Sequence, residues 1–326
     1  MIDIIIPVYN TPIKDLNRCL NSILKQTYKS YKVYIIDDGS KASISRYLDN
    51  YVNNKPNFHV RHIPNGGASN ARNIGLRISK SEYVTFLDSD DTFTPNFLSE
   101  AIKILQDNNL DIVVGGYNEV ADSYVYKIRK SKSGFHLYDD NHTIKYFNKL
   151  ISSKLSKDNL ELDSTPTGRI YTKLYKRSVF KDVYFNRNIS ISEDTLFLID
   201  IMKNVNRIGV VPNIWYNYYQ NYYSIVHKSI TNNDINHLLD FINEIYKRML
   251  KCRNRRLKNA YRYRIFKTSC DLYNKLIKTK LMDPKDIFSM NLFRKTFSEL
   301  DFTDYIDVSK KEIDTYNKLI KYIEIV

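Results

Sequence analysis

Residues 83–91 read Tyr-Val-Thr-Phe-Leu-Asp-Ser-Asp-Asp, an apolar run that ends in three carboxylates within four positions. Apolar runs of this length with polar flanks are typical of buried strands. Open α/β sheets bind their ligands beyond the carboxyl ends of such strands. Because neighbouring carboxylates repel one another, a cluster of this kind is typical of a site that holds a divalent cation. An acidic turn that caps the next helix is the alternative interpretation of these residues taken alone.

The sequence on both sides of this run alternates strand and helix signals. Short apolar segments at 2–6, 33–36, 58–63 and 110–114 predict further strands. Helical spacing of apolar residues follows the first and third of them, and Thr11-Pro12 and Thr94-Pro95 each supply a start signal for a helix. This βαβα order predicts an α/β fold with a mainly parallel central sheet and helices on both faces.

The division of the chain follows from its length and its composition along the sequence. The 326 residues are enough for one large domain and one small one. No linker or internal repeat separates residues 120–230 from the first part of the chain, whereas the pattern from 231 onward is helical. We therefore expect a domain over 1–230 and a helical, basic C-terminal module over 231–326.

Charge and cysteine usage narrow the compartment and the partners. The formal net charge of +14 predicts an anionic partner. Cys19, Cys252 and Cys270 lack metal-ligand spacing, which favours a reducing compartment. No apolar stretch reaches the roughly 18 residues of a membrane-spanning helix, and Asp3 interrupts the N-terminal apolar run that a leader would need. The sequence predicts a cytoplasmic protein, with any membrane contact peripheral at the inner face of the cell membrane.

Polar clusters follow four of the predicted strands, at 7–10, 37–40, 65–73 and 88–91. Because the carboxyl ends of parallel strands share one edge of a sheet, these clusters are expected to converge on one crevice. Their chemistry suits a nucleotide. Asp38 can accept a hydrogen bond from a pyrimidine N–H, Gly66-Gly67 lets the backbone approach the ligand, and Arg72 can pair with phosphate or stack on a base. The carboxylates at 88–91 would hold a metal that bridges a diphosphate.

In this order and at these spacings, the four clusters resemble the motifs of the family 2 glycosyltransferases of the GT-A fold. The resemblance covers residues 1–120 and, more loosely, 160–230. It implies a GT-A nucleotide-sugar-binding domain and an inverting transfer of a sugar from a nucleotide diphosphate donor, most often UDP, with Mn²⁺ or Mg²⁺. The implied acceptor is a glycan, lipid-linked or anionic polymer acceptor of the cell envelope or capsule. Within this resemblance Asp90 would ligate the metal and Asp88 would lie near the ribose, and the nucleotide-sugar-binding residues would be Pro7, Tyr9, Asp38, Asn65, Arg72, Asp88 and Ser89.

The family also uses an acidic pair at a helix start, which matches Glu193-Asp194 after Ser192. Without the resemblance, an N-cap serine followed by acids in the first turn is a sufficient structural explanation. With it, Asp194 is the predicted catalytic base that takes the proton of the acceptor hydroxyl. His227 is a candidate metal ligand, with a surface histidine as the alternative. Trp215 would either stack on a sugar or belong to the core.

A strongly basic stretch lies at 247–267, with ten cations, no acid and interleaved apolar residues. This composition predicts a basic amphipathic helix that binds an anionic membrane surface or an anionic polymer acceptor. The alternative is a solvated face of an ordinary helical bundle. No recognisable nucleic-acid-binding module accompanies the charge, so nucleic acid is not an expected partner.

Two other classes of function compete with the glycosyltransferase. A sugar-nucleotide nucleotidyltransferase would carry a Gly-rich, basic loop directly after the first strand, where this chain has Pro-Val-Tyr-Asn-Thr-Pro at 7–12. A non-catalytic nucleotide-sugar-binding scaffold subunit would be expected to lack Asp90 or Asp194, and both are present. The sequence leaves open the donor sugar, the acceptor, the linkage and the oligomeric state.

Overall fold

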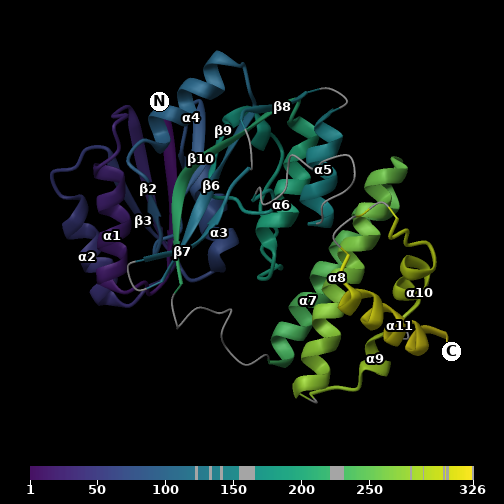
Figure 1. The fold of residues 1–326 in the computed structure, drawn as a ribbon. Coiled ribbons are helices and arrows are strands. Elements are labelled where there is room, and N and C mark those ends of the chain that lie inside the picture. The colour runs from purple at the N-terminus through teal and green to yellow at the C-terminus, as the bar shows by residue number, and fades with distance from the viewer. Residues whose placement is uncertain are drawn as a thin grey trace. The chain divides into compact units, whose positions relative to one another are not determined.

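The computed structural model describes residues 1–121, 124–131, 134–139, 142–153, 166–220, 231–279, 281–288, 290–303, 305 and 308–324. The chain forms two compact units, one of residues 1–143 and 161–224 and the other of residues 144–160 and 225–326. Figure 1 shows the ribbon of both units. The second unit includes helix α5 (Thr143–Ser152) almost entirely, whereas the expected domain over 1–230 had taken in this helix. Tyr146, Leu150 and Ile151 of α5 are buried, so its apolar face needs a packing partner that its own sequence does not identify.

A mixed sheet forms the centre of the first unit. Its main strands follow the order β3-β2-β1-β4-β9-β6-β10-β5. The pairs β1–β2, β2–β3, β1–β4 and β6–β10 are parallel, and β9 runs antiparallel to both β4 and β6. This confirms the α/β class and adds an antiparallel part to the sheet. The strands are β1 (Ile2–Val8), β2 (Tyr31–Asp37), β3 (Phe58–His62), β4 (Tyr83–Phe86), β5 (Thr92–Phe93), β6 (Ile112–Ala121), β7 (Tyr124–Arg129), β8 (His136–Asp139), β9 (Lys173–Lys176) and β10 (Arg207–Tyr219).

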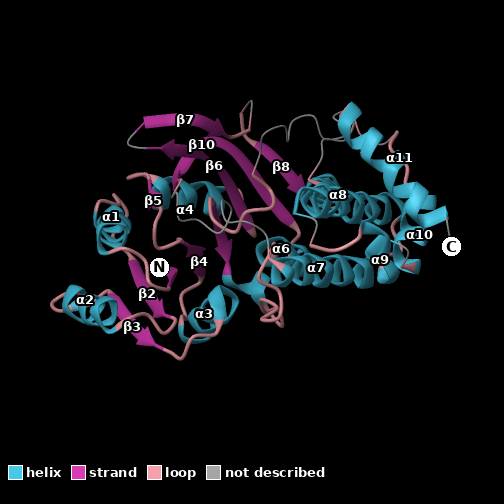
Figure 2. Ribbon diagram, turned by 90° about the horizontal axis from the view of Figure 1, so that it is seen from below, coloured by secondary structure: helices cyan, strands magenta, loops and turns pink. Residues whose placement is uncertain are grey.

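Helices cover the sheet on both faces, as Figure 2 shows in a view from below. Helices α1 (Ile13–Leu24), α2 (Ala42–Val52) and α4 (Phe97–Asp107) share one apolar core with Ile2, Ile4 and Ile6 of β1. Helix α3 (Gly67–Ile78) packs on the opposite face, where a Cβ added at Gly75 would lie 2.4 Å from Cγ2 of Ile5. The alternation of β1 side chains therefore separates the two helical layers. The same unit contains helix α6 (Glu193–Ile201) and the short helices η3 (Arg177–Phe180) and η4 (Met202–Asn204).

The two Thr-Pro pairs do not cap their helices as predicted. Helix α1 begins after Pro12 and helix α4 after Asn96, and neither helix has a side-chain cap. The hydroxyl of Thr11 instead lies 2.6 Å from that of Ser89, and Thr94 donates to a backbone carbonyl of β10. Both threonines thus connect distant segments, because bonds across the sheet edge replace the local cap.

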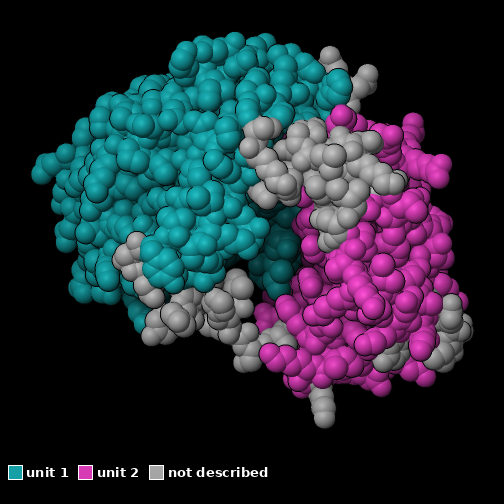
Figure 3. Space-filling view, viewed as in Figure 1, with its two compact units in different colours: residues 1–143, 161–224 teal, residues 144–160, 225–326 magenta. Residues whose placement is uncertain are grey.

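The described part of the second unit is helical, and Figure 3 colours it separately from the first. A capping box of Thr231 and Asp234 starts α7 (Asn232–Lys251). The rings of Tyr263, Phe297, Phe302 and Tyr316 surround Phe266 of α8 (Arg255–Thr279). The remaining helices are α9 (Pro284–Phe288), α10 (Asn291–Ser298) and α11 (Lys310–Glu324).

The basic stretch at 247–267 is not one amphipathic helix. Helix α7 ends at Lys251 and α8 begins at Arg255. Leu250 is 51% exposed, but the other interleaved apolar side chains belong to the core of the unit. Those buried side chains are Met249, Leu257, Tyr261, Tyr263 and Phe266. The prediction of one basic amphipathic helix is therefore wrong, because the chain breaks between α7 and α8 and the bundle uses most of the apolar residues for its own packing. Among the described helices, none combines the length and hydropathy needed to cross a bilayer.

Candidate active site

Hydrogen bonds join the polar clusters that follow β1, β2 and β4. The backbone N–H of Asn10 donates to Oγ of Ser40 at 2.9 Å, and Oδ1 of Asn10 accepts from the N–H of Lys41 at 2.9 Å. The hydroxyls of Thr11 and Ser89 lie 2.6 Å apart. The loop after β1 therefore lies between the loops after its two neighbours, at the carboxyl edge of the parallel strands.

Asp38 organises the loop that precedes α3. Its buried carboxylate accepts from the backbone N–H of Gly66 at 2.9 Å and of Gly67 at 2.7 Å. The side-chain amide of Asn65 donates to the carbonyl of Asp38 at 2.9 Å. Burial raises the pKa of Asp38, the two N–H donors lower it, and the charge of Asp37 adds to the net increase. Gly67 has φ +83°, a backbone conformation that residues other than glycine rarely adopt.

Arg72 of α3 brings the acidic strand end and the acidic helix start together. Its guanidinium lies 3.0 Å from Oδ1 of Asp88, 3.0 Å from Oε1 of Glu193 and 3.2 Å from Oδ1 of Asp194. The side chain of Arg72 is only 6% exposed. Burial lowers the pKa of Arg72, but the charges of the three carboxylates outweigh it and leave the pKa raised. One cation thus holds together carboxylates from segments far apart in the sequence.

Asp194 lies in the first turn of α6 with a side chain that is 16% exposed. Its contact with Arg72 is an ion pair without hydrogen-bond alignment, and in the described part of the chain Oδ1 has no hydrogen-bond partner. Burial raises the pKa of Asp194 to about 7; Arg72 opposes this increase, and the charges of Glu193 and Asp88 add to it. Ser192 is the N-cap but has φ +61° and no side-chain cap bond. The capping explanation of this acidic pair therefore lacks its hydrogen bond.

The three aspartates after β4 have different surroundings. Asp91 is buried, accepts from the Tyr216 hydroxyl at 2.6 Å and from the N–H of Tyr219 at 2.8 Å, and so fastens this loop to β10. Asp88 faces Arg72. Asp90 is half-buried, and its backbone carbonyl accepts from the guanidinium of Arg18 at 2.6 Å. Burial and the nearby charges of Asp90 and Asp88 raise the pKa of Asp91.

Comparison with known proteins identifies the family. Residues 3–184 match the family described as Glycosyl transferase family 2. The chain belongs to this family. That assignment and the GT-A-like fold confirm the resemblance found in the sequence.

Several relatives from this family cover different shares of the chain. It is 33% identical to "Glycosyltransferase GlyG" of Streptococcus pneumoniae over 139 residues, 42% of this chain and 43% of that protein. It is 28% identical to "Poly(ribitol-phosphate) beta-N-acetylglucosaminyltransferase TarP" of Staphylococcus aureus over 263 residues, 77% of this chain and 72% of that protein. The matches to GlyG, GlyA and EpsJ span 43%, 26% and 61% of those relatives' own lengths.

A solved structure shares the fold over nearly the whole chain. The structure of S. aureus TarS 1-349 in complex with UDP has a TM-score of 0.69 and 19% sequence identity, covering 99% of this chain and 91% of that one. The same fragment in complex with UDP-GlcNAc has a TM-score of 0.64 at 20% identity. At 19–20% sequence identity, this similarity establishes the fold of the chain and nothing about its substrates.

Family 2 glycosyltransferases typically use a divalent metal, and Asp90 suits one in this chain. Its carboxylate is a hard oxygen donor. Burial, and after it the negative charges of the neighbouring aspartates, Asp90 among them, raise the pKa values of Cys19 and Asp91, and a cation would offset those charges. No group of three or more side chains that could hold a metal occurs among the described residues. Mg²⁺ or Mn²⁺ would then take most of its ligands from phosphate oxygens and water. His227 lies outside the described residues.

The other predicted residues fall into an exposed group and a buried one. Tyr9 is 56% exposed, Asn65 is exposed and Pro7 is half-buried, all at the edge where the clusters meet. Trp215 is fully buried and donates from Nε1 to Oε2 of Glu100 at 2.8 Å. It therefore belongs to the core and has no free face for a sugar.

Two sets of contacts in this region are not predicted from the sequence. Glu193 and Asp194 of α6 both form ion pairs with Arg72 of α3. These pairs exist only because the fold brings the two helix ends together. Lys173 is buried in β9, where its Nζ donates to the carbonyls of Pro166 and Arg169. Burial lowers the pKa of Lys173 to about 7, with Asp194 opposing the decrease. These contacts depend on loop paths that periodicity does not predict.

Proposed function

We propose that this chain is an inverting glycosyltransferase that moves a sugar from a UDP-sugar to a hydroxyl of a glycan, lipid-linked or polymer acceptor. The observation that carries the proposal is the position of Arg72, within 3.0–3.2 Å of Asp88, Glu193 and Asp194. This contact unites the strand-end clusters with a carboxylate suited to act as a base. Family membership and the GT-A-like fold support the same function.

Asp194 would take the proton of the acceptor hydroxyl while that oxygen attacks the anomeric carbon from the face opposite the leaving diphosphate. A base with a pKa of about 7 is both ionised and able to accept a proton near neutral pH. Arg72 would keep this carboxylate in place, because the ion pair fixes Asp194 on α6 next to the strand edge. A single displacement by one base inverts the anomeric centre.

The nucleotide would lie along the carboxyl ends of β1, β2 and β4. Asp38 fixes the Gly66-Gly67 turn, so the backbone of the loop before α3 is preorganised for close approach of a ligand. Tyr9, Asn65, Pro7 and Ser89 would contribute the walls of this pocket. A divalent metal held by Asp90 would offset the negative charge that develops on the leaving diphosphate.

The relatives support the choice of donor and acceptor. TarS structures are described as complexes with UDP and with UDP-GlcNAc, and the printed name of TarP describes an N-acetylglucosaminyltransferase that acts on poly(ribitol-phosphate). We extend to this chain a UDP-linked donor and a polymer acceptor of the cell envelope. The predicted peripheral contact with an anionic membrane, through the cations of 247–267, belongs to the same proposal.

A screen of nucleotide sugars by thermal shift and calorimetry, with and without Mn²⁺, tests the donor and the metal together. We expect stabilisation by one or more UDP-sugars, strengthened by Mn²⁺ and weakened in Asp90→Ala. Asp194→Asn should keep donor binding and lose transfer by about 10²–10⁴-fold. Asp182→Asn is the matched control, because Asp182 is exposed and has φ +55°, which asparagine adopts readily. Full transfer by Asp194→Asn would exclude that residue as the base.

A further inference from the structure

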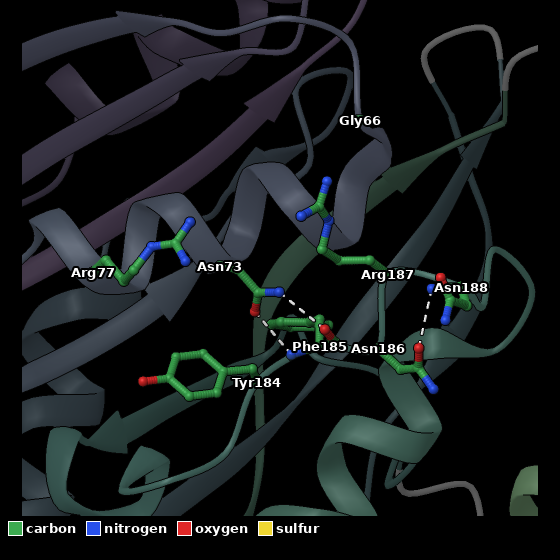
Figure 4. A pocket seen from close by; sticks show the side chains of 8 residues that line it. All are labelled: Gly66, Asn73, Arg77, Tyr184, Phe185, Asn186, Arg187 and Asn188. Carbon is green, nitrogen blue, oxygen red and sulfur yellow. Dashed lines mark hydrogen bonds between the residues drawn. The ribbon is translucent and has the colours of Figure 1, made fainter.

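A cavity of ≈ 600 Å³ lies along α3, and the proposed reaction assigns no role to it. It is formed by the helix and by the segment that precedes α6 (Figure 4). The residues that line it are Gly66, Asn73, Arg77, Tyr184, Phe185, Asn186, Arg187 and Asn188. All of them belong to the first unit.

The floor of this cavity is fixed by two reciprocal hydrogen bonds. The side-chain amide of Asn73 donates to the carbonyl of Phe185 at 2.9 Å, and its Oδ1 accepts from the N–H of Phe185 at 2.8 Å. The ring of Phe185 stacks on Phe197 of α6 with centroids 3.7 Å apart and planes 6° apart. Asn73 and Phe185 are both buried. The segment is therefore held to α3 from one side and to α6 from the other, which gives the neighbouring side chains a defined base.

The cavity is lined by two cations and no acid. Arg77 and Arg187 are exposed, and neither forms an ion pair within the part of the chain that the structure describes. Arg72, on the same helix, contacts three carboxylates. In a protein of net charge +14 an exposed arginine is ordinary, but two arginines that line one cavity without a counter-ion among the described residues favour an anionic ligand there. Figure 4 shows Arg77 on α3 and Arg187 on the facing segment.

The neutral residues that line the cavity narrow the chemical class of the ligand. Guanidinium groups match the oxygens of phosphate in a two-pronged geometry. Asn186, Asn188 and the 60% exposed Tyr184 add groups that bind hydroxyls. A ligand that carries both phosphate groups and hydroxyls would be a chain of polyols or sugars linked by phosphodiesters. A simple carboxylate ligand would leave most of these groups unused.

The position of the cavity connects it to the acceptor. Gly66, at one end, donates to Asp38 in the nucleotide-side loop. Residues 189–192 connect the segment 184–188 to α6, whose second residue is Asp194. We propose that this cavity is a subsite for a phosphodiester of an anionic polymer acceptor, with Arg77 and Arg187 as its phosphate-binding residues. This inference rests on the proposed function, since it names the class of acceptor for the same reaction.

Calorimetric titration of the full chain with a synthetic ribitol-phosphate oligomer, and separately with UDP, tests the subsite. Arg77→Gln/Arg187→Gln should weaken binding of the oligomer at least tenfold and change the affinity for UDP less than twofold. The control is Lys14→Gln/Lys25→Gln, which removes two exposed cations, one in α1 and one at its C-cap, and should leave both affinities unchanged. Melting temperatures of both variants check that the fold is retained.

The outcomes separate the subsite from the proposed function. The subsite is overturned if the wild-type chain does not bind the oligomer, or if both double variants weaken it equally, which would indicate general charge attraction. An equal loss of UDP binding in Arg77→Gln/Arg187→Gln would assign the cavity to the donor and also overturn it. Arginine-dependent binding of the oligomer by a chain that binds no nucleotide sugar would retain the subsite and refute the proposed transfer.

Discussion

At the scale of single residues, the contacts of Arg72 determine which side chains the candidate site brings together. From its position after the Gly66-Gly67 turn, Arg72 is predicted to bind a phosphate or a base. The structure shows its guanidinium engaged by three carboxylates. Sequence spacing identifies which polar residues follow the strands, because every strand end of a parallel sheet lies at one edge. It does not identify ion pairs between α3 and α6, because those depend on how the loops after β9 return to the sheet.

The pKa of Asp194 leads to a prediction for the pH dependence of transfer. Its carboxylate must be ionised to accept a proton, and its pKa is raised from 3.8 to about 7. The rate at saturating substrate should therefore fall about tenfold per pH unit below pH 7 and become flat above it. A rate that stays constant down to pH 5 would contradict this assignment.

The same raised pKa has the opposite effect on stability, which is greater at low pH. Between about pH 4 and pH 7 the folded state binds a proton that the unfolded state has lost, so this group lowers stability as the pH rises through that window. Asp194→Asn should remove this dependence and leave the protein at least as stable at pH 8. Urea unfolding at pH 5 and pH 8, compared with Asp182→Asn, measures it.

Removing the cation tests whether Arg72 acts through Asp194. Arg72→Gln takes away the largest influence that lowers the pKa of Asp194, so the midpoint of the pH–rate profile should move to higher pH. It should also cost about 3 kcal/mol of stability, since buried carboxylates lose their partner. Arg46→Gln, on the exposed side of α2, is the control. A higher KM for the UDP-sugar with an unmoved pH profile would instead assign Arg72 to the donor alone.

At the scale of helices and strands, prediction succeeded where apolar periodicity alone decides the outcome. The strand at 2–6 extends over Ile2–Val8 and that at 33–36 over Tyr31–Asp37. The errors lie where long-range contacts compete with local ones. Thr11 bonds to Ser89 instead of capping α1. The basic stretch breaks between Lys251 and Arg255, because the packed helices of the second unit use its apolar residues as core.

The packing of α3 on β1 gives a stability prediction for one glycine. A Cβ at Gly75 would lie 2.4 Å from Cγ2 of Ile5, closer than packed atoms tolerate. Gly75→Ala should therefore destabilise the fold by about 1–3 kcal/mol despite the better helix propensity of alanine. At Gly168 the nearest atom to an added Cβ is Oγ1 of Thr195 at 3.5 Å, an ordinary contact, so Gly168→Ala is the control. Equal urea midpoints for the two variants would show that α3 shifts freely.

At the scale of the whole molecule, charge and fold have separate roles. The α/β unit carries the candidate site, whereas the most concentrated positive charge lies in a helical unit whose apolar residues are buried. Composition predicted the charge and its segment. It could not predict which apolar side chains remain exposed, because that depends on which helices pack together.

This burial changes the expected mode of membrane contact. With the apolar side chains in the core, attachment to an anionic surface would rest on exposed cations such as Lys251, Arg253 and Arg255. Each contributes about 1 kcal/mol near an anionic surface, so changing all three to Gln should lower partitioning to phosphatidylglycerol-rich vesicles by about 100-fold. Binding should also be lost at 0.5 M salt, because screening removes surface electrostatics but not apolar insertion.

Changing Lys14, Lys25 and Lys203, which are exposed on the first unit, to Gln is the charge-matched control. Vesicle co-sedimentation measures both variants: binding that survives high salt would require an apolar contact, and equal losses would mean that net charge, rather than this segment, drives attachment.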